Sequence, residues 1–72
     1  MKRSISKQIG ARVKSHRLFL ELSQQELADL AGVDRKTINR MENSHFSPSV
    51  DTLFRLCTVF GTHPTQLLEG VK

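Results

Sequence analysis

Residues 23–43 read SQQELADLAGVDRKTINRMEN, and this stretch decides the fold. Ser23 and Glu26 have the spacing of a capping box, in which the serine hydroxyl accepts from the third amide while the glutamate reaches back to the serine amide. We therefore expect a helix that begins at Gln24. It ends after about two turns at Gly32, because glycine most readily adopts the left-handed conformation that terminates a helix.

A second helix of this stretch follows Asp34, which is its candidate cap, and we expect it to run from Arg35 to about Asn43. Asparagine tolerates the left-handed helix terminus, although less easily than glycine does. Two short helices around one glycine turn have the spacing of a helix-turn-helix, placed here at about residues 24–43. In that motif the second helix is offered to a groove.

The helix expected after Asp34 has a polar face with a single sign of charge. Its cationic and carboxamide side chains fall on one arc when successive residues are placed about 100° apart. They are Arg35, Lys36, Asn39, Arg40 and Asn43. A solvated face usually mixes charge signs, whereas these groups can donate to phosphate oxygens and to guanine and adenine base edges. The arc favours nucleic acid as the partner.

Upstream, residues 5–21 are expected to form an amphipathic helix with Ser4 as its cap. The apolar stripe of this helix comprises Ile5, Ile9, Val13, His16 and Leu20. The first twenty residues also carry six basic and no acidic side chains, within a net charge of +4 for the whole chain. This charge adds attraction to a phosphate backbone.

Downstream, Ser47 or Ser49 can cap a fourth helix, which Gly61 ends. Its core stripe comprises Leu53, Leu56, Cys57 and Phe60. A short fifth helix is expected from Pro64, a residue favoured in the first turn, and it stops at Gly70. No stretch alternates as a strand would, so the predicted fold class is all-α with five helices.

The length and composition bound what the chain can do. With 72 residues, 38% of them hydrophobic, and one cysteine, it fits a single domain over residues 1–72 without an internal disulfide. A chain this short has little interior volume for a substrate pocket in addition to its core. We therefore expect that the protein is not an enzyme. No apolar run approaches the roughly 20 residues of a membrane span, and we expect a cytoplasmic protein with no membrane partner.

Other candidate sites have simpler interpretations. Cys57 lies in the core stripe, so we expect a buried thiol rather than a nucleophile. The three histidines lack the spacing of a zinc site, and we expect no metal and no cofactor. Three basic residues either contact phosphate or are ordinary solvated charges. These are Lys7, Arg12 and Lys14.

The stretch from Ile9 to Leu68 resembles the phage-repressor family of helix-turn-helix domains, the Cro/C1 or XRE type. The resemblance is carried by an arginine late in the first helix, SQQELA, AGV, the glutamate of MEN, PSVDTLFRL and FGTHPTQLL. It implies a compact five-helix lambda-repressor-like DNA-binding domain. By that resemblance the second helix lies across the DNA backbone and the third helix lies in the major groove.

The resemblance also implies roles for individual side chains. The expected DNA-binding set is Gln24, Arg35, Lys36, Thr37, Asn39, Arg40 and Asn43. Within it, Gln24 matches the glutamine that donates to a phosphate. Base contacts are expected from Arg35, Lys36 and Arg40. Asn39 reads a base or donates to a phosphate, and Thr37 contacts phosphate or simply packs.

Glu42 lies at the rim of the apolar face, where a lone carboxylate is poorly solvated and needs a partner. The resemblance pairs it with Arg17, in a largely buried ion pair that ties the first helix to the end of the third. The chain departs from the family at Glu21 and Ser44, where glycine is common. The turns after the first and third helices are therefore expected to differ in shape.

One recognition helix reads only a few base pairs, so we expect a homodimer on a palindromic operator. Phe54 with Val71 and the fifth helix, or else Leu18, are the candidate dimer contacts. The predicted function is a sequence-specific, double-stranded DNA-binding transcriptional regulator that acts as a repressor. An antitoxin, a restriction-modification controller and a protein-interaction module that has lost DNA binding are the alternatives.

Overall fold

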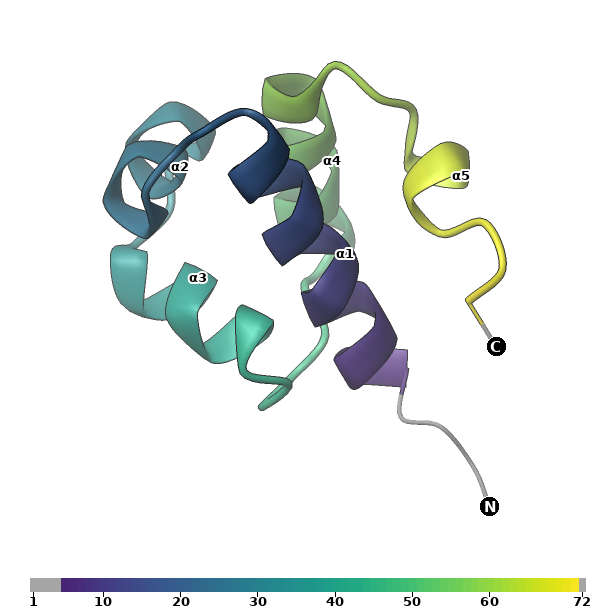
Figure 1. Ribbon diagram of the computed structural model, residues 1–72. Coiled ribbons are helices and arrows are strands. Elements are labelled where there is room, and N and C mark those ends of the chain that lie inside the picture. The colour runs from purple at the N-terminus through teal and green to yellow at the C-terminus, as the bar shows by residue number, and fades with distance from the viewer. Residues whose placement is uncertain (1–4, 72) are drawn as a thin grey trace.

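The computed structural model describes residues 5–71, and within them the chain forms five helices and no strand. The helices are α1 (Ile5–Phe19), α2 (Gln24–Ala31), α3 (Arg35–Glu42), α4 (Val50–Phe60) and α5 (Pro64–Leu67). In Figure 1, α2 and α3 lie on one side of α1 and α5 lies on the other. The all-α class and the order of the five helices are confirmed, while the expected cap Ser4 lies outside the described residues.

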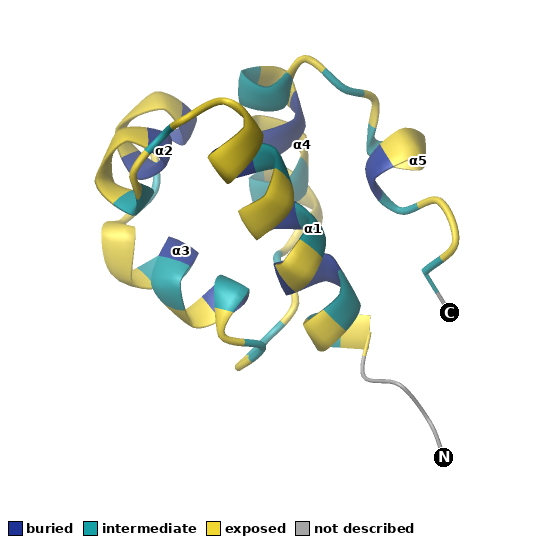
Figure 2. Cartoon of the chain, in the orientation of Figure 1, coloured by how far each residue is buried: buried dark blue, intermediate teal, exposed yellow. Residues whose placement is uncertain are grey.

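The core lies where α1, α2, α3 and α4 meet, and α5 closes it from one side. Its largest fully buried side chains are Val13, Leu27, Ile38, Met41, Leu56 and Leu67. The stripe on α1 is shorter than expected, because Ile5 and Leu20 are exposed. α1 ends at Phe19 rather than at residue 21, so Leu20 leaves the stripe. Ile5 lies in the first turn of α1, where exposed and half-buried residues alternate (Figure 2).

Side-chain caps begin two of the helices as the sequence indicates. The Ser23 hydroxyl accepts from the Glu26 amide at 3.0 Å, and the Ser23 amide donates to the Glu26 carboxylate at 2.8 Å. The backbone and hydroxyl hydrogen bonds from Ser23 lower the pKa of Glu26. Ser49, rather than Ser47, caps α4. Asp34 occupies the cap position of α3, but its carboxylate makes no capping hydrogen bond, so only its backbone carbonyl serves the helix.

The first four helices end in the same backbone turn, which contains one left-handed residue. These residues are Glu21 at φ 57°, Gly32 at 72°, Ser44 at 68° and Gly61 at 70°. After α3, the Ser44 amide donates to the Met41 carbonyl and the His45 amide to the Arg40 carbonyl, both at 3.0 Å, the two bonds of a Schellman motif. The expectation that the non-glycine turns differ in shape is therefore wrong, because these hydrogen bonds impose the same conformation on Glu21 and Ser44.

The end of α3 lies directly against α1 at Gly10. A Cβ atom placed there would collide with the Met41 carbonyl oxygen, and it would lie 3.4 Å from the Cα atom of Glu42. Only glycine therefore permits this approach of the two helices. This close approach places Glu42 beside α1, within hydrogen-bonding distance of Arg17.

Candidate nucleic-acid interface

α3 has one exposed polar face and one buried face. Arg35, Lys36, Arg40 and Asn43 are exposed, and Thr37 and Asn39 are half-buried. Ile38 and Met41, on the other face, are fully buried. Figure 2 shows this division along α3, with yellow segments between the buried ones. The cations and carboxamides of the arc therefore lie at the surface, either exposed or half-buried, and no other segment within residues 5–71 buries them fully.

A largely buried ion pair holds α3 against α1. The Arg17 Nε atom donates to Glu42 Oε2 at 2.7 Å and Arg17 Nη2 donates to Glu42 Oε1 at 3.0 Å. The side chains of Arg17 and Glu42 are only 10% and 3% exposed. The hydrogen bonds that Arg17 donates to Glu42 raise the pKa of Arg17, so the guanidinium stays charged. Arg17 Nη1 also donates to the Leu22 carbonyl at 2.7 Å, which fixes the turn before α2.

Three carboxamide side chains form consecutive hydrogen bonds that connect this ion pair to the exposed arc. Gln24 Nε2 donates to Glu42 Oε1, Asn39 Nδ2 donates to Gln24 Oε1, and Asn43 Nδ2 donates to Asn39 Oδ1, each at 3.2 Å. We call Glu42, Gln24, Asn39 and Asn43 the amide series. The sequence places three of its members among separate DNA contacts but contains no local signal for their mutual hydrogen bonds, which depend on how α2 packs against α3.

The loop after α3 also contacts the arc. The Arg40 guanidinium carbon lies 6.0 Å from the centroid of the Phe46 ring, within the range of a cation–π interaction. Phe46 is half-buried and packs against the core, so its ring is a fixed platform. The Ser47 hydroxyl is hydrogen-bonded to that of Ser6 on α1 at 2.9 Å, which holds the loop in place. The loop thus supports a cation although residues 44–49 contain no Lys or Arg.

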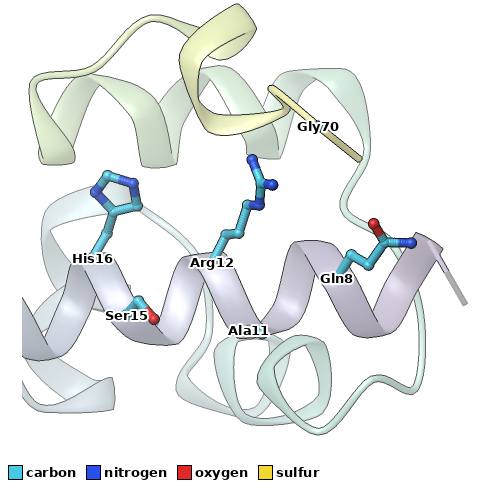
Figure 3. A pocket seen from close by; sticks show the side chains of 6 residues that line it. All are labelled: Gln8, Ala11, Arg12, Ser15, His16 and Gly70. Atoms are coloured by element: carbon cyan, nitrogen blue, oxygen red, sulfur yellow. The ribbon is translucent and has the colours of Figure 1, made fainter. Parts of the chain in front are cut away.

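The basic residues of α1 have different environments. Arg12 is half-buried, and its Nη1 atom donates to the Leu67 carbonyl at 2.8 Å. Figure 3 shows its guanidinium pointing from α1 toward the C-terminal segment that contains Gly70. Arg12 is therefore not an ordinary solvated charge, because its hydrogen bond joins α5 to α1. Lys7 and Lys14 are exposed, and both expectations for them stay open.

The remaining expectations concern the dimer contacts, Cys57, metal binding and membrane spans. Phe54 and Leu18 are 55% and 54% exposed, but Val71 packs against the core and is not a free dimer contact. Cys57 is 2% exposed, and burial raises the pKa of its thiol, as expected for a core cysteine. Among residues 5–71, no three His, Cys, Asp or Glu side chains gather as a metal site would require. No helix of that segment is both long and apolar enough to cross a membrane.

Two short helices around Gly32, the second with an exposed cationic face, define the helix-turn-helix class. The helix-turn-helix family model HTH_3 matches residues 13–67. The chain therefore belongs to this family of DNA-binding transcriptional regulators, which confirms the family that the sequence motifs indicate.

The chain is also similar to individual regulatory proteins. The chain is 39% identical over 49 residues to an HTH-type transcriptional regulator from Methanothermobacter thermautotrophicus, covering 68% of this chain and 71% of that protein. The restriction-modification controller protein C.AhdI from Aeromonas hydrophila matches with a TM-score of 0.82 at 29% identity. The P22 c2 repressor, solved with a synthetic operator, matches with a TM-score of 0.79 at 29% identity. Each structural match covers 86% of this chain and 94% of the other.

Proposed function

We propose that the chain is a sequence-specific repressor that binds a palindromic operator in double-stranded DNA as a homodimer. In this proposal α3 lies in the major groove, where Arg35, Lys36 and Arg40 donate to base edges. The observation that carries it is the exposed arc of one charge sign on a helix whose other face is locked into the core. A face of this kind attracts phosphate and keeps its donors directed outward.

Phosphate contacts in this proposal come from α2 as well as α3. Gln24 begins α2, where unpaired backbone amides favour an anion, and its Nε2 atom has a second hydrogen beyond the one donated to Glu42. Thr37 and Asn39 are half-buried, so Thr37 contacts phosphate or packs, while Asn39 reads a base or donates to a phosphate. The DNA-binding residues remain the seven that the resemblance implies.

The repressor role and the operator symmetry have separate support. The P22 c2 repressor, at 29% identity, has been solved in complex with a synthetic operator. A single α3 reads few base pairs, so two copies on half-sites about one helical turn apart provide the discrimination a regulator needs. Restriction-modification control is a second candidate, favoured by the match that covers 94% of C.AhdI. Both roles require operator binding and differ in the gene that is controlled.

The test begins with selection of bound sequences from a random duplex pool, which we expect to yield a palindrome. Affinity for the selected duplex should fall by about 10³-fold or more between 50 and 200 mM salt if about six phosphates are contacted. Arg40→Ala should weaken binding by about 1–3 kcal/mol, through loss of a base contact.

Arg55→Ala is the matched control, because Arg55 is also an exposed helical arginine but lies on α4, where it pairs with Asp51 at 2.9 Å. We expect its affinity for the selected duplex to stay close to that of the unaltered protein. A pool without enriched sequences, together with a flat salt profile, would contradict the proposal and favour a protein-interaction module.

A further inference from the structure

The hydrogen bonds of the amide series all run in one direction, because each carboxamide donates to the member before it, starting from the Glu42 carboxylate. An ionised carboxylate can only accept hydrogen bonds, and both Glu42 oxygens are already bonded to the buried Arg17 guanidinium. Any group that bonds to Glu42 Oε1 must therefore donate. Gln24 meets this requirement with its Nε2 atom at 3.2 Å, so its carbonyl oxygen Oε1 has to face the other way, toward α3.

This direction passes from one carboxamide to the next. Because Gln24 presents an oxygen to α3, Asn39 must turn its Nδ2 atom toward it, and the two atoms lie 3.2 Å apart. The Asn39 Oδ1 atom then faces Asn43, whose Nδ2 atom donates to it at 3.2 Å. A carboxamide alone on a surface can rotate by 180° and exchange donor for acceptor at little cost. Here each such rotation would set two donors or two acceptors against each other.

The fixed direction leaves each asparagine with a defined edge for a ligand. Asn39 keeps the second Nδ2 hydrogen and the second lone pair of Oδ1, and Asn43 keeps its own Oδ1 atom and second hydrogen. In the major groove an adenine edge offers the N7 acceptor beside the N6 donor, which asparagine can bond with both atoms. Only one orientation of the carboxamide matches that order for a given position of the helix.

We propose that Glu42 is a positioning residue for base reading, which acts through Gln24 to hold the Asn39 and Asn43 carboxamides in the one orientation that reads adenine. This inference rests on the proposed function, because it assumes that the arc lies in a major groove. It assigns the buried ion pair a second role, since the charge that ties α3 to α1 also sets the order of donors on the reading face.

The first test uses the free protein. Gln24→Met removes the carboxamide of the second member while sparing the ion pair. We expect the Asn39 and Asn43 side-chain amide hydrogens, observed by NMR, to exchange with solvent about five-fold faster, the factor for one lost net hydrogen bond. Gln25→Met is the matched control, because Gln25 undergoes the same change one residue along, and within residues 5–71 its Nε2 atom donates only to Asp29, at 2.9 Å.

A second variant tests the direction. Asn39→Ala should release the Asn43 amide but leave the Gln24 amide protected, because Gln24 is still bonded to Glu42. It also provides the result if Gln24→Met does not fold. Release of Gln24 by Asn39→Ala, or unchanged Asn39 and Asn43 signals in Gln24→Met, would overturn the proposal.

The DNA measurement separates orientation from stability. Gln24→Met should lower the preference for adenine at one position of each half-site by about five-fold, relative to the other bases, in addition to any uniform loss from a phosphate contact. A uniform loss of affinity with unchanged preference overturns the reading role. If the unaltered chain binds no duplex at all, the proposed function fails, and with it base reading, while the NMR result still decides whether the asparagine carboxamides are ordered through Gln24.

Discussion

Arg17 contributes to the fold through each nitrogen of its guanidinium. Nε and Nη2 donate to Glu42, and Nη1 donates to the Leu22 carbonyl. Burial of a charge is unfavourable unless its hydrogen-bonding groups are satisfied, and among the described residues no buried side-chain nitrogen or oxygen lacks a partner. The ion pair therefore specifies how three segments meet, and its loss leaves an uncompensated carboxylate on α3.

Arg17→Ala should lower the free energy of unfolding by about 3–5 kcal/mol, because Glu42 would remain buried without its cation. Urea unfolding followed by circular dichroism measures this loss. Arg55→Ala is the control, since its ion pair with Asp51 joins side chains that are 50% and 77% exposed, and such pairs contribute about 0.5 kcal/mol or less. Equal stabilities of the two variants would show that the buried pair has no special weight.

The residues of the site were predictable to different degrees. The exposed arc follows from helical periodicity alone, because Ile38 and Met41 mark the opposite face. The partner of Glu42 came only from the family resemblance, since no local spacing relates it to Arg17. The bonds of Gln24 with Glu42 and Asn39 could not be predicted, because they depend on the distance between two helices that are separate in the sequence.

At the scale of elements, the sequence predicts helix ends well where a capping box or a glycine turn defines them. The capping box at Ser23 and the glycine turns at Gly32 and Gly61 are contained within a few residues, so the sequence alone determines them. Ser44 is different, because its left-handed backbone follows from the hydrogen bonds of the turn rather than from its own preference. The hydrogen bonds of the turn therefore outweigh the unfavourable backbone conformation of Ser44.

Ser44→Gly should stabilise the protein by up to about 1 kcal/mol. A non-glycine residue in the left-handed region costs about 1–2 kcal/mol, which glycine avoids, and part of that gain is offset by the greater freedom of glycine in the unfolded chain. Ser15→Gly, at an exposed interior position of α1, should instead destabilise by about 0.5–1 kcal/mol. Thermal melts of both variants give the two signs, and a lower melting temperature in Ser44→Gly would exclude relief of strain.

Gly10→Ala should destabilise the protein by about 1–3 kcal/mol, because the new methyl group collides with the backbone carbonyl of Met41 and backbone cannot move aside as a side chain can. The intrinsic preference of helices for alanine predicts the opposite sign. Urea unfolding decides between them. An increase in stability would mean that α1 and α3 separate without cost, and Ser15→Ala is the control for a substitution to alanine on the exposed side of α1.

At the scale of the whole molecule, the formal charge overstates what is available to a polyanion. Of the six basic residues in the first twenty, Arg12 joins α5 to α1 and Arg17 lies in the buried pair. Composition could not reveal this use of cations inside the fold, because it does not depend on burial. The exposed cations of the described chain therefore lie on α3 and α1, apart from Arg55 on α4, which pairs with Asp51.

We propose that two copies contact each other through the outer face of α4, which contains the expected contact residue Phe54. Val50 and Phe54 are 71% and 55% exposed, and they lie four residues apart, so they share one helix face. Phe54→Ser should leave binding to a single half-site unchanged but weaken binding to the full palindrome by about ten-fold, equivalent to about 1.4 kcal/mol of contact between copies. Titrations of both duplexes measure the difference. Leu30→Ser, at a 63% exposed position on α2, is the control, and an equal response of the two variants would place the contact elsewhere.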